Sequence, residues 1–154
     1  MPEVPDDDSG KSAIIHYPAS CVSSPEGHAV LISGASGSGK SSLCLLLMDR
    51  GWSLVSDDQT SLRDDGSSLM AGAAQHLAGL IEIRNLGIVE APERAGEAPV
   101  VLHVSLDPEA PRFIDKAGSV ILLGHTVPSI AICPDLAMAA IKTEYALRLY
   151  GKRE

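Results

Sequence analysis

Short runs of hydrophobic residues alternate along the chain with turns that contain Gly, Pro or Asp. Runs of this kind, rich in Val, Ile and Leu and bounded by turn residues, are typical of β-strands. The acidic turn at residues 64–66 lies between two such runs and predicts a β-hairpin. The predicted strands cover residues 13–15, 20–22, 29–32, 52–56, 60–62, 68–70, 80–83, 88–89, 100–104 and 120–123.

Two segments have the spacing of helices. Residues 42–50 form a mostly apolar run, and residues 135–150 carry Leu136, Ala139 and Ala140 at helical intervals. Pro134 and Asp135 stand where a helix commonly begins. Two helices among many short strands do not match a regular βαβ alternation. The sequence therefore predicts an α/β fold in which a mixed β-sheet carries one helix near residue 42 and a C-terminal helix.

The chain length of 154 residues fits one domain, which at this size buries roughly 70 % of the surface that its unfolded chain exposes. Residues 1–12 contain two prolines and the acidic run Asp6 to Asp8. Such a composition buries little apolar surface, so this segment is predicted to be a disordered tail. Residues 13–154 are predicted to form the single domain.

Net charge and cysteine content argue against several classes of partner and binding site. The formal net charge of −8 argues against nucleic acid as a partner, because that binding needs clustered Lys and Arg. The apolar runs are too short to span a bilayer, and the acidic N-terminus is unlike a signal peptide. Cys21, Cys44 and Cys133 include no C-x-x-C pair, which argues against a disulfide framework and a zinc site. We interpret the chain as a cytoplasmic protein, with Cys44 in the core.

The strongest chemical signal is GASGSGKS at residues 34–41, a match to the phosphate-binding pattern G-x-x-x-x-G-K-[ST]. It follows a predicted strand and precedes a predicted helix, the context in which backbone N–H groups surround phosphates. Lys40 can reach the β- and γ-phosphates, and Ser41 can bind Mg²⁺. An ordinary Gly/Ser-rich turn is the alternative. The predicted nucleotide-binding residues are Gly34, Ala35, Ser36, Gly37, Ser38, Gly39, Lys40, Ser41 and Ser42.

A pair of acids, Asp57 and Asp58, follows the predicted strand at residues 52–56. Beside a phosphate loop, one carboxylate can accept a proton from an attacking hydroxyl while the other holds Mg²⁺. A solvated turn is the alternative for adjacent acids. The phosphate loop upstream favours the functional interpretation.

Three motifs together resemble the catalytic domain of the HPr kinase/phosphorylase family. They are GASGSGKS at residues 34–41, LVSDD at residues 54–58 and LIEIRNLGIV at residues 80–89, in the family's order. The last is similar to the family signature L-E-I-R-G-L-G-I, with Asn85 in place of the usual glycine. The resemblance covers roughly residues 14–150 and implies the fold of the HPr kinase and PEP carboxykinase type.

This resemblance implies roles for three acids. Asp58 would accept the proton of a substrate serine, and Asp57 would support the metal or the orientation of the site. Adjacent strand residues point to opposite faces, and the sequence does not separate these two roles. Glu82 resembles a second metal-binding acid of the family, with a solvent-facing carboxylate as the alternative. The predicted metal ligands are Ser41, Glu82 and Asp57.

A histidine and an arginine complete the predicted site. His16 stands roughly where the family has a histidine beside the catalytic acid, although an insertion around residues 17–19 separates it further from Lys40; His28 is the nearer alternative. Arg84 could stabilise the transferring phosphoryl group or form a structural salt bridge. The predicted catalytic residues are Asp58, Lys40, His16, Asp57 and Arg84.

The implied function is that of an ATP- and Mg²⁺-dependent serine kinase, with an HPr-like phosphocarrier protein of a phosphotransferase system as its substrate. The family also implies a homo-oligomer, in its longer members a hexamer. Residues 127–134 stand where the family has an arginine-containing loop linked to the phosphorylase reaction, so kinase activity is the safer prediction. A small-molecule kinase, with Arg63, Arg94 or Arg112 in a lid, and a non-catalytic ATP sensor are the alternatives.

Overall fold

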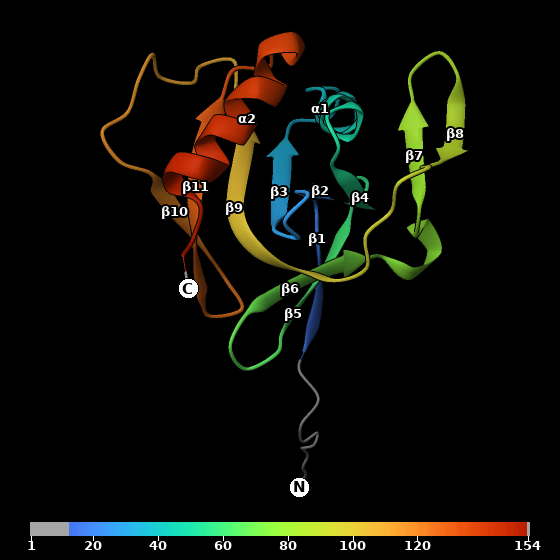
Figure 1. Cartoon of the computed structure of the whole chain (residues 1–154), viewed down its shortest axis with the longest axis horizontal. Helices are drawn as coiled ribbons and strands as arrows, with labels where there is room; N and C mark the ends of the chain where they lie inside the picture. Colours follow the sequence, from blue (N-terminus) through green and yellow to red (C-terminus); the bar gives the residue numbers. More distant parts are fainter. Residues whose placement is uncertain (1–12, 154) are drawn as a thin grey trace, which may run out of the picture.

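A computed structural model describes residues 13–153, so the predicted tail at residues 1–12 lies outside the described residues. The described chain combines a mixed β-sheet with two α-helices, which confirms the predicted fold class (Figure 1). That residues 13–154 form a single domain stays a prediction. The strands are β1 (Ile14–Tyr17), β2 (Ser20–Ser23), β3 (Ala29–Gly34), β4 (Ser53–Ser56), β5 (Thr60–Asp64), β6 (Leu69–Ala73), β7 (Leu80–Ile83), β8 (Gly87–Glu90), β9 (Ala98–Leu106), β10 (Gly118–Leu122) and β11 (His125–Ile132), and the helices are α1 (Lys40–Asp49), α2 (Leu136–Tyr150) and the 3₁₀ turn η1 (Gln75–Leu77).

The main sheet is built around three parallel strands. β3 pairs in parallel with β9, and β9 pairs in parallel with β11, so their carboxyl ends meet at one edge, beside α1 (Figure 1). β2 and β4 extend the sheet beyond β3, and β10 extends it beyond β11, by antiparallel pairing. Ligands of open α/β sheets bind at the carboxyl ends of parallel strands. The edge from which β3 leads toward α1 is therefore where a binding site is expected.

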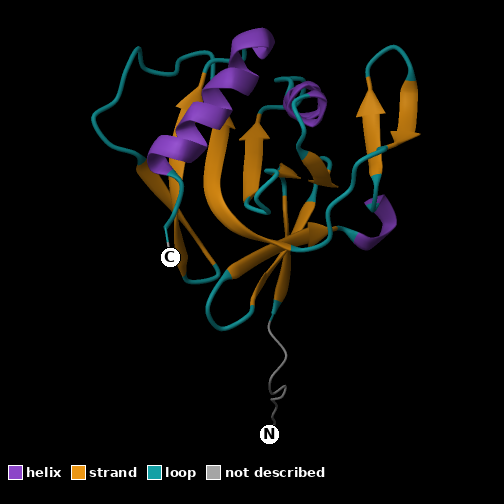
Figure 2. Ribbon diagram, viewed as in Figure 1, coloured by secondary structure: helices purple, strands orange, loops and turns teal. Residues whose placement is uncertain are grey.

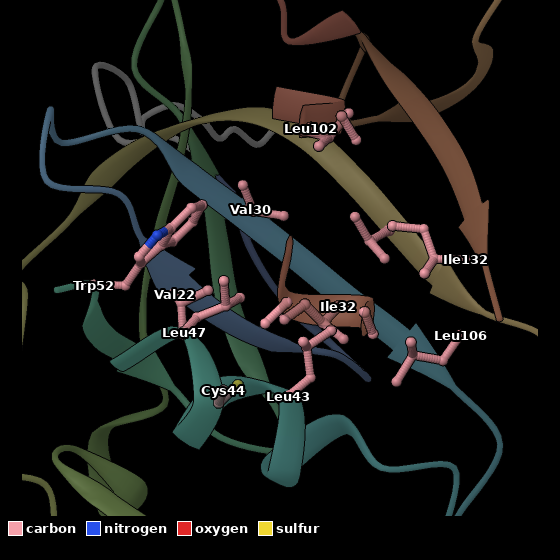
Figure 3. Close-up of a cluster of buried hydrophobic side chains, with 14 of the residues drawn as sticks. Val22, Val30, Ile32, Leu43, Cys44, Leu47, Trp52, Leu102, Leu106 and Ile132 are labelled. Carbon is pink, nitrogen blue, oxygen red and sulfur yellow. The ribbon is translucent and has the colours of Figure 1, made fainter. Parts of the chain in front are cut away.

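Helices α1 and α2 lie beside the main sheet (Figure 2), and residues of both belong to one buried core with it. Figure 3 shows part of this core, in which Leu43 and Leu47 of α1 lie near Ile32 and Val22 of the sheet. Cys44 is fully buried there, which confirms the predicted core position, and burial raises the pKa of its thiol. Neither described helix has the length and apolar composition needed to cross a membrane.

A second core is formed mainly by strand residues and includes no helix residue. β1, β5 and β6 form an antiparallel extension that joins the first residues of β9, Ala98 and Pro99. Leu62 of β5 and Leu69 of β6 pack in this core with Leu31 of β3. The predicted hairpin at residues 64–66 is confirmed, because β5 and β6 pair on either side of it. Strand β9 thus belongs to both parts of the sheet.

The segment before the last helix is a strand, where the family resemblance had placed a loop. Residues 125–132 form β11, which pairs with β10 from His125 to Ser129, Pro128 included. Its parallel pairing with β9 begins only at Ser129. Proline lacks a backbone N–H. Because β9 pairs with β11 only from the next residue onward, the missing N–H of Pro128 removes no hydrogen bond between these two strands.

Strands β7 and β8 form a separate two-stranded hairpin beside the main sheet (Figure 1). Its turn contains Asn85 at a φ of 77°, in the left-handed region. Asparagine adopts this conformation more readily than most residues with a side chain. Asn85 therefore adopts a backbone conformation that glycine, the usual residue at this position of the signature, also adopts readily.

Candidate active site

The phosphate loop, residues 34–41, joins the carboxyl end of β3 to the first turn of α1. Gly37 and Gly39 have φ values of 79° and 106°, which glycine adopts at little cost. A Cβ atom on Gly39 would also lie 2.9 Å from Leu136 Cδ2. The positive φ of Gly39 thus favours glycine at this position, and a larger residue would also have to displace the end of the Leu136 side chain.

Lys40 is the first residue of α1, and its side chain folds back over the loop. The Nζ atom donates to the carbonyl oxygens of Gly34 at 3.0 Å and Ala35 at 3.3 Å. A positive charge is thereby held at the N-terminus of a helix, where the free N–H groups also attract anions.

The loop fits a phosphate-containing ligand. Ser38 Oγ is the buried side-chain polar atom for which the described residues supply no hydrogen-bond partner. An orphaned hydroxyl is costly, and a phosphate oxygen is a strong acceptor for it. Together with the glycine-rich backbone and Lys40, Ser38 makes the loop chemically suited to the phosphates of a nucleotide.

Asp57, at the end of β4, is the centre of the polar network beside the loop. Its side chain is 6 % exposed. Ser41 Oγ lies 2.7 Å from Oδ1 and 2.9 Å from Oδ2, and Ser20 Oγ donates to Oδ1 at 2.9 Å. The backbone N–H of Glu82 donates to Oδ2 at 3.2 Å. These donors fix the carboxylate against the first turn of α1.

The pairing of Ser41 with Asp57 is a suitable donor set for Mg²⁺, which binds through one or two protein oxygens plus water and substrate phosphates. Within the described residues, no group of three His, Cys, Asp or Glu side chains could enclose a metal ion. A magnesium ion here would therefore depend on nucleotide phosphates for its remaining ligands.

Asp58 differs sharply from its neighbour. Its side chain is exposed, and its φ of 68° lies in the left-handed region. The backbone N–H of Asp58 donates to Ser20 Oγ at 2.9 Å. A non-glycine residue in this region carries strain that its surroundings must hold, a feature that often marks functional sites. Ser20 supplies a fully buried anchor for that conformation.

Glu82 and Arg84 lie on the β7 side of the site. Ile81 is buried while Glu82 is exposed, as the strand alternation predicts. Glu82 reaches the network through its backbone N–H, which contacts Asp57. Arg84 is exposed and forms no ion pair with any described residue, so the structural salt bridge considered for it is not present.

His16 is not brought to the two aspartates. It lies on β1, is exposed, and its Nδ1 atom is 3.4 Å from Ser61 Oγ on the paired strand β5. The alternative, His28, precedes β3 and so lies near the end of that strand opposite the phosphate loop. Among the described residues, hydroxyl groups rather than an imidazole therefore contact Asp57.

Ser20 is the site residue that sequence reasoning missed. It lies on β2, 37 positions before Asp57 in the chain, and it contacts both aspartates. A serine at the start of a four-residue strand that also ends in a serine gives no local signal of this contact. The antiparallel pairing of β2 with β4 brings it there.

Replacing Ser20 with alanine is expected to disturb both aspartates at once. Leaving buried hydrogen-bonding groups without partners costs about 1–3 kcal/mol, and 1.4 kcal/mol in a transition state is about tenfold in rate. If the site transfers phosphate from ATP, as the family resemblance implies, kcat should fall about tenfold or more, with a smaller change in the KM for ATP. Ser23→Ala, on the same strand but bonded to Ser24, is the matched control. Equal kcat values for the two variants would contradict the role of Ser20.

Comparison with known proteins agrees with this geometry. A family model described as HPr Serine kinase C-terminal domain matches residues 19–107. The chain belongs to this family. Similar curated proteins include the HPr kinase/phosphorylase of Exiguobacterium sp., 42 % identical over 78 residues, and that of Clostridium tetani, 36 % identical over 75 residues. These matches cover 50 % and 49 % of the chain but only 25 % of each relative, so the matched part spans about a quarter of their length.

The fold has a similar solved relative. The structure of the Hpr(Ser) kinase/phosphatase from Coxiella burnetii superposes with a TM-score of 0.73 at 27 % sequence identity. The match covers 87 % of this chain and 92 % of that one. The likeness therefore extends beyond residues 19–107 and includes most of the described fold.

Proposed function

We propose that the chain is a Mg²⁺- and ATP-dependent protein serine kinase whose substrate is an HPr-like phosphocarrier protein. The proposal rests on the different environments of the two adjacent acids beside the phosphate loop. Asp57 is buried and accepts hydrogen bonds from two hydroxyls and one backbone amide, whereas Asp58 is exposed and held in a left-handed conformation. Family membership supports the same reaction class.

The residues of the loop would hold the nucleotide. The backbone of residues 34–39, the Ser38 hydroxyl and the Lys40 ammonium would bind the phosphates, with Ser41 and Asp57 as the metal-binding pair. Magnesium, when bound, supplies positive charge that offsets the negative charge on the phosphate oxygens. Glu82 is the further candidate ligand, and Arg84, which has no ion-pair partner among residues 13–153, could contact the transferring group from the β7 side.

Asp58 would then accept the proton of the substrate serine. Its exposed carboxylate can meet a hydroxyl presented from outside, which the buried Asp57 cannot do without releasing its donors. The serine oxygen attacks the γ-phosphorus of ATP, the bond to the β-phosphate oxygen breaks, and ADP leaves. Positioning and charge stabilisation account for most of the acceleration in such transfers.

A small-molecule kinase is less well supported, because such enzymes use free arginines in a lid. Arg63 is bonded to Glu97 through two nitrogens, at 2.7 and 2.6 Å. Arg94 packs against Gly79, where a Cβ atom would clash with it. Arg63 lies on strand β5 rather than in a loop. Of the three arginines considered, only Arg112 is left without either kind of contact among the described residues. Kinase rather than phosphorylase activity and a homo-oligomeric state stay predictions that rest on the family resemblance. A cytoplasmic location stays a prediction that rests on composition and cysteine content.

Transfer of labelled γ-phosphate tests the proposal. The chain is incubated with Mg²⁺ and labelled ATP together with an HPr-like protein, and in parallel with the same protein carrying alanine at its acceptor serine. We expect label only in the serine form, and no label when EDTA removes Mg²⁺. Label in a small-molecule fraction instead would favour the alternative kinase. ATP binding without any transfer would favour a sensor.

A further inference from the structure

A cavity lies far from the phosphate loop, at the opposite end of the main sheet. It has a volume of about 490 Å³ and is bounded by the turn before β3, the residues after α1, and the last turn of α2. Strand β3 begins at this cavity and ends at the phosphate loop, and its six residues span about 20 Å. The cavity is therefore separate from the proposed nucleotide site. We call it the Trp52 cavity.

Its inner wall is apolar. Trp52, Val101 and Leu147 line it, and Trp52 and Val101 are 2 % and 5 % exposed. Figure 3 shows Trp52 at the edge of the buried core, on the side of Val22 and Leu47. The indole N–H donates to Glu144 Oε2 at 3.1 Å, which fixes the ring in the wall. The cavity is within the size range of small-molecule sites.

Its rim is cationic, in a chain whose net charge is −8. Arg148, Lys152 and Arg153 all line the cavity and are exposed. Arg148 lies over the ring of Tyr145 at 4.7 Å, and Lys152 forms no ion pair with a described residue. Arg153 Nη2 donates to the carbonyl oxygen of Arg148. None of these three side chains is paired with a described carboxylate.

The acidic residues at the cavity do not cancel this charge. Glu144 is bonded to Arg50 and Trp52, and the hydrogen bond from Arg50 lowers the pKa of the Glu144 carboxyl. Glu26, on the turn before β3, is the remaining acid of the lining, beside His28. Three cationic side chains thus face one acid that is not bonded to Arg50, which leaves an excess of two positive charges at the cavity. Cations also favour a helix C-terminus in general, but that role needs neither an apolar wall nor a cavity.

We propose that the Trp52 cavity binds a small organic anion that has an apolar body and a phosphate or carboxylate group. The apolar part would lie against Trp52, Val101 and Leu147, and the anionic group would contact Lys152 and Arg148 at the rim. Charge-assisted hydrogen bonds supply the orientation, and burial of the apolar part supplies affinity. This site does not depend on the proposed kinase activity.

Tryptophan fluorescence tests the proposal, because Trp52 is the single tryptophan of the chain. The full chain is titrated with phenyl phosphate and with benzoate, with inorganic phosphate and phenol as probes that each lack one feature. We expect a saturable change in emission with phenyl phosphate, benzoate or both. Inorganic phosphate and phenol should each need at least about ten times higher concentration for a half-maximal change in emission, which corresponds to a binding free energy weaker by about 1.4 kcal/mol. A saturable response to neither organic anion up to ~10 mM, or one matched by phenol, would overturn the proposal.

Variants locate the binding. Lys152→Met keeps the aliphatic stem and removes the charge, and with Arg148→Gln it should weaken the apparent affinity about tenfold. Both side chains are exposed, so the fold should persist, and the melting temperature checks this. Lys142→Met, an exposed lysine of α2 outside the cavity lining, is the matched control and should change the affinity less than twofold. Lys40→Ala should leave the response intact. Loss of the fluorescence response in Lys40→Ala would place the binding at the phosphate loop. An unchanged affinity in the variant that combines Lys152→Met with Arg148→Gln would place it outside the cavity. Either result would refute the cavity site.

Discussion

Asp58→Asn is expected to lower the rate of phosphoryl transfer about 10²- to 10⁴-fold, the usual contribution of a general base. Asparagine has the same shape as aspartate but cannot accept the serine proton. It also tolerates the left-handed conformation that Asp58 adopts at a φ of 68°. The backbone bond from residue 58 to Ser20 should therefore persist, and the affinity for Mg²⁺-ATP should change little.

Rapid-quench transfer kinetics and calorimetric ATP titration measure these two effects in the same protein. Asp49→Asn is the matched control, since Asp49 is an exposed acid at the far end of α1. Near-normal transfer by Asp58→Asn would refute Asp58 as the base. Loss of both transfer and ATP binding would show instead that residue 58 supports the nucleotide site.

Lys40→Ala is expected to have an effect of similar size through a different step. The ammonium lies over the loop carbonyls of Gly34 and Ala35, where it can neutralise phosphate charge. Removing one such preorganised charge costs about 10² to 10³ in kcat, or roughly 2.7–4 kcal/mol. Because the same group binds ground-state phosphates, the affinity for ATP should fall as well.

The measurement is a pair of kcat and KM values for ATP, with Lys142→Ala as the control for loss of an exposed lysine. We expect kcat/KM to fall at least about a thousandfold in Lys40→Ala and to stay unchanged in Lys142→Ala. An unchanged KM with reduced kcat would show that Lys40 stabilises the transition state but not bound ATP. Unchanged values for both constants would contradict the assignment of the phosphate loop.

The elements that the sequence predicted best are those encoded in contiguous residues. The phosphate loop, α1 and α2 depend on local patterns, such as glycine spacing and helical periodicity, and the structure contains these elements close to the predicted bounds. The hairpin at residues 64–66 depends on a local turn in the same way. The left-handed Asn85 shows that even the departure from the family signature has a local backbone reason.

The parts that the sequence did not predict depend on contacts between distant residues. Ser20 meets Asp57 only because β2 pairs with β4. The different environments of Asp57 and Asp58 depend on a backbone turn that two identical residues do not reveal. His16 was placed by its order in the chain, whereas strand pairing directs it toward Ser61 on β5.

Strand β11 is another element that the sequence did not predict. Pro128 and the polar residues around it obscure the alternation that would mark a strand, so its existence depends on neighbours that are far away in the sequence. β10 and β9 pair with it on either side, and the pairing with β9 starts after the proline. Tertiary context thus overrides the local pattern here.

The most direct test of the account is the intact mass of an HPr-like protein after incubation with Mg²⁺-ATP and the chain, run side by side with the Asp58→Asn variant. We expect one added phosphate, located on the acceptor serine, with the wild-type chain and almost none with the variant. An unmodified acceptor in the presence of a wild-type chain that still binds ATP would contradict the proposed kinase. Equal phosphorylation by both proteins would contradict the site chemistry built on Asp58.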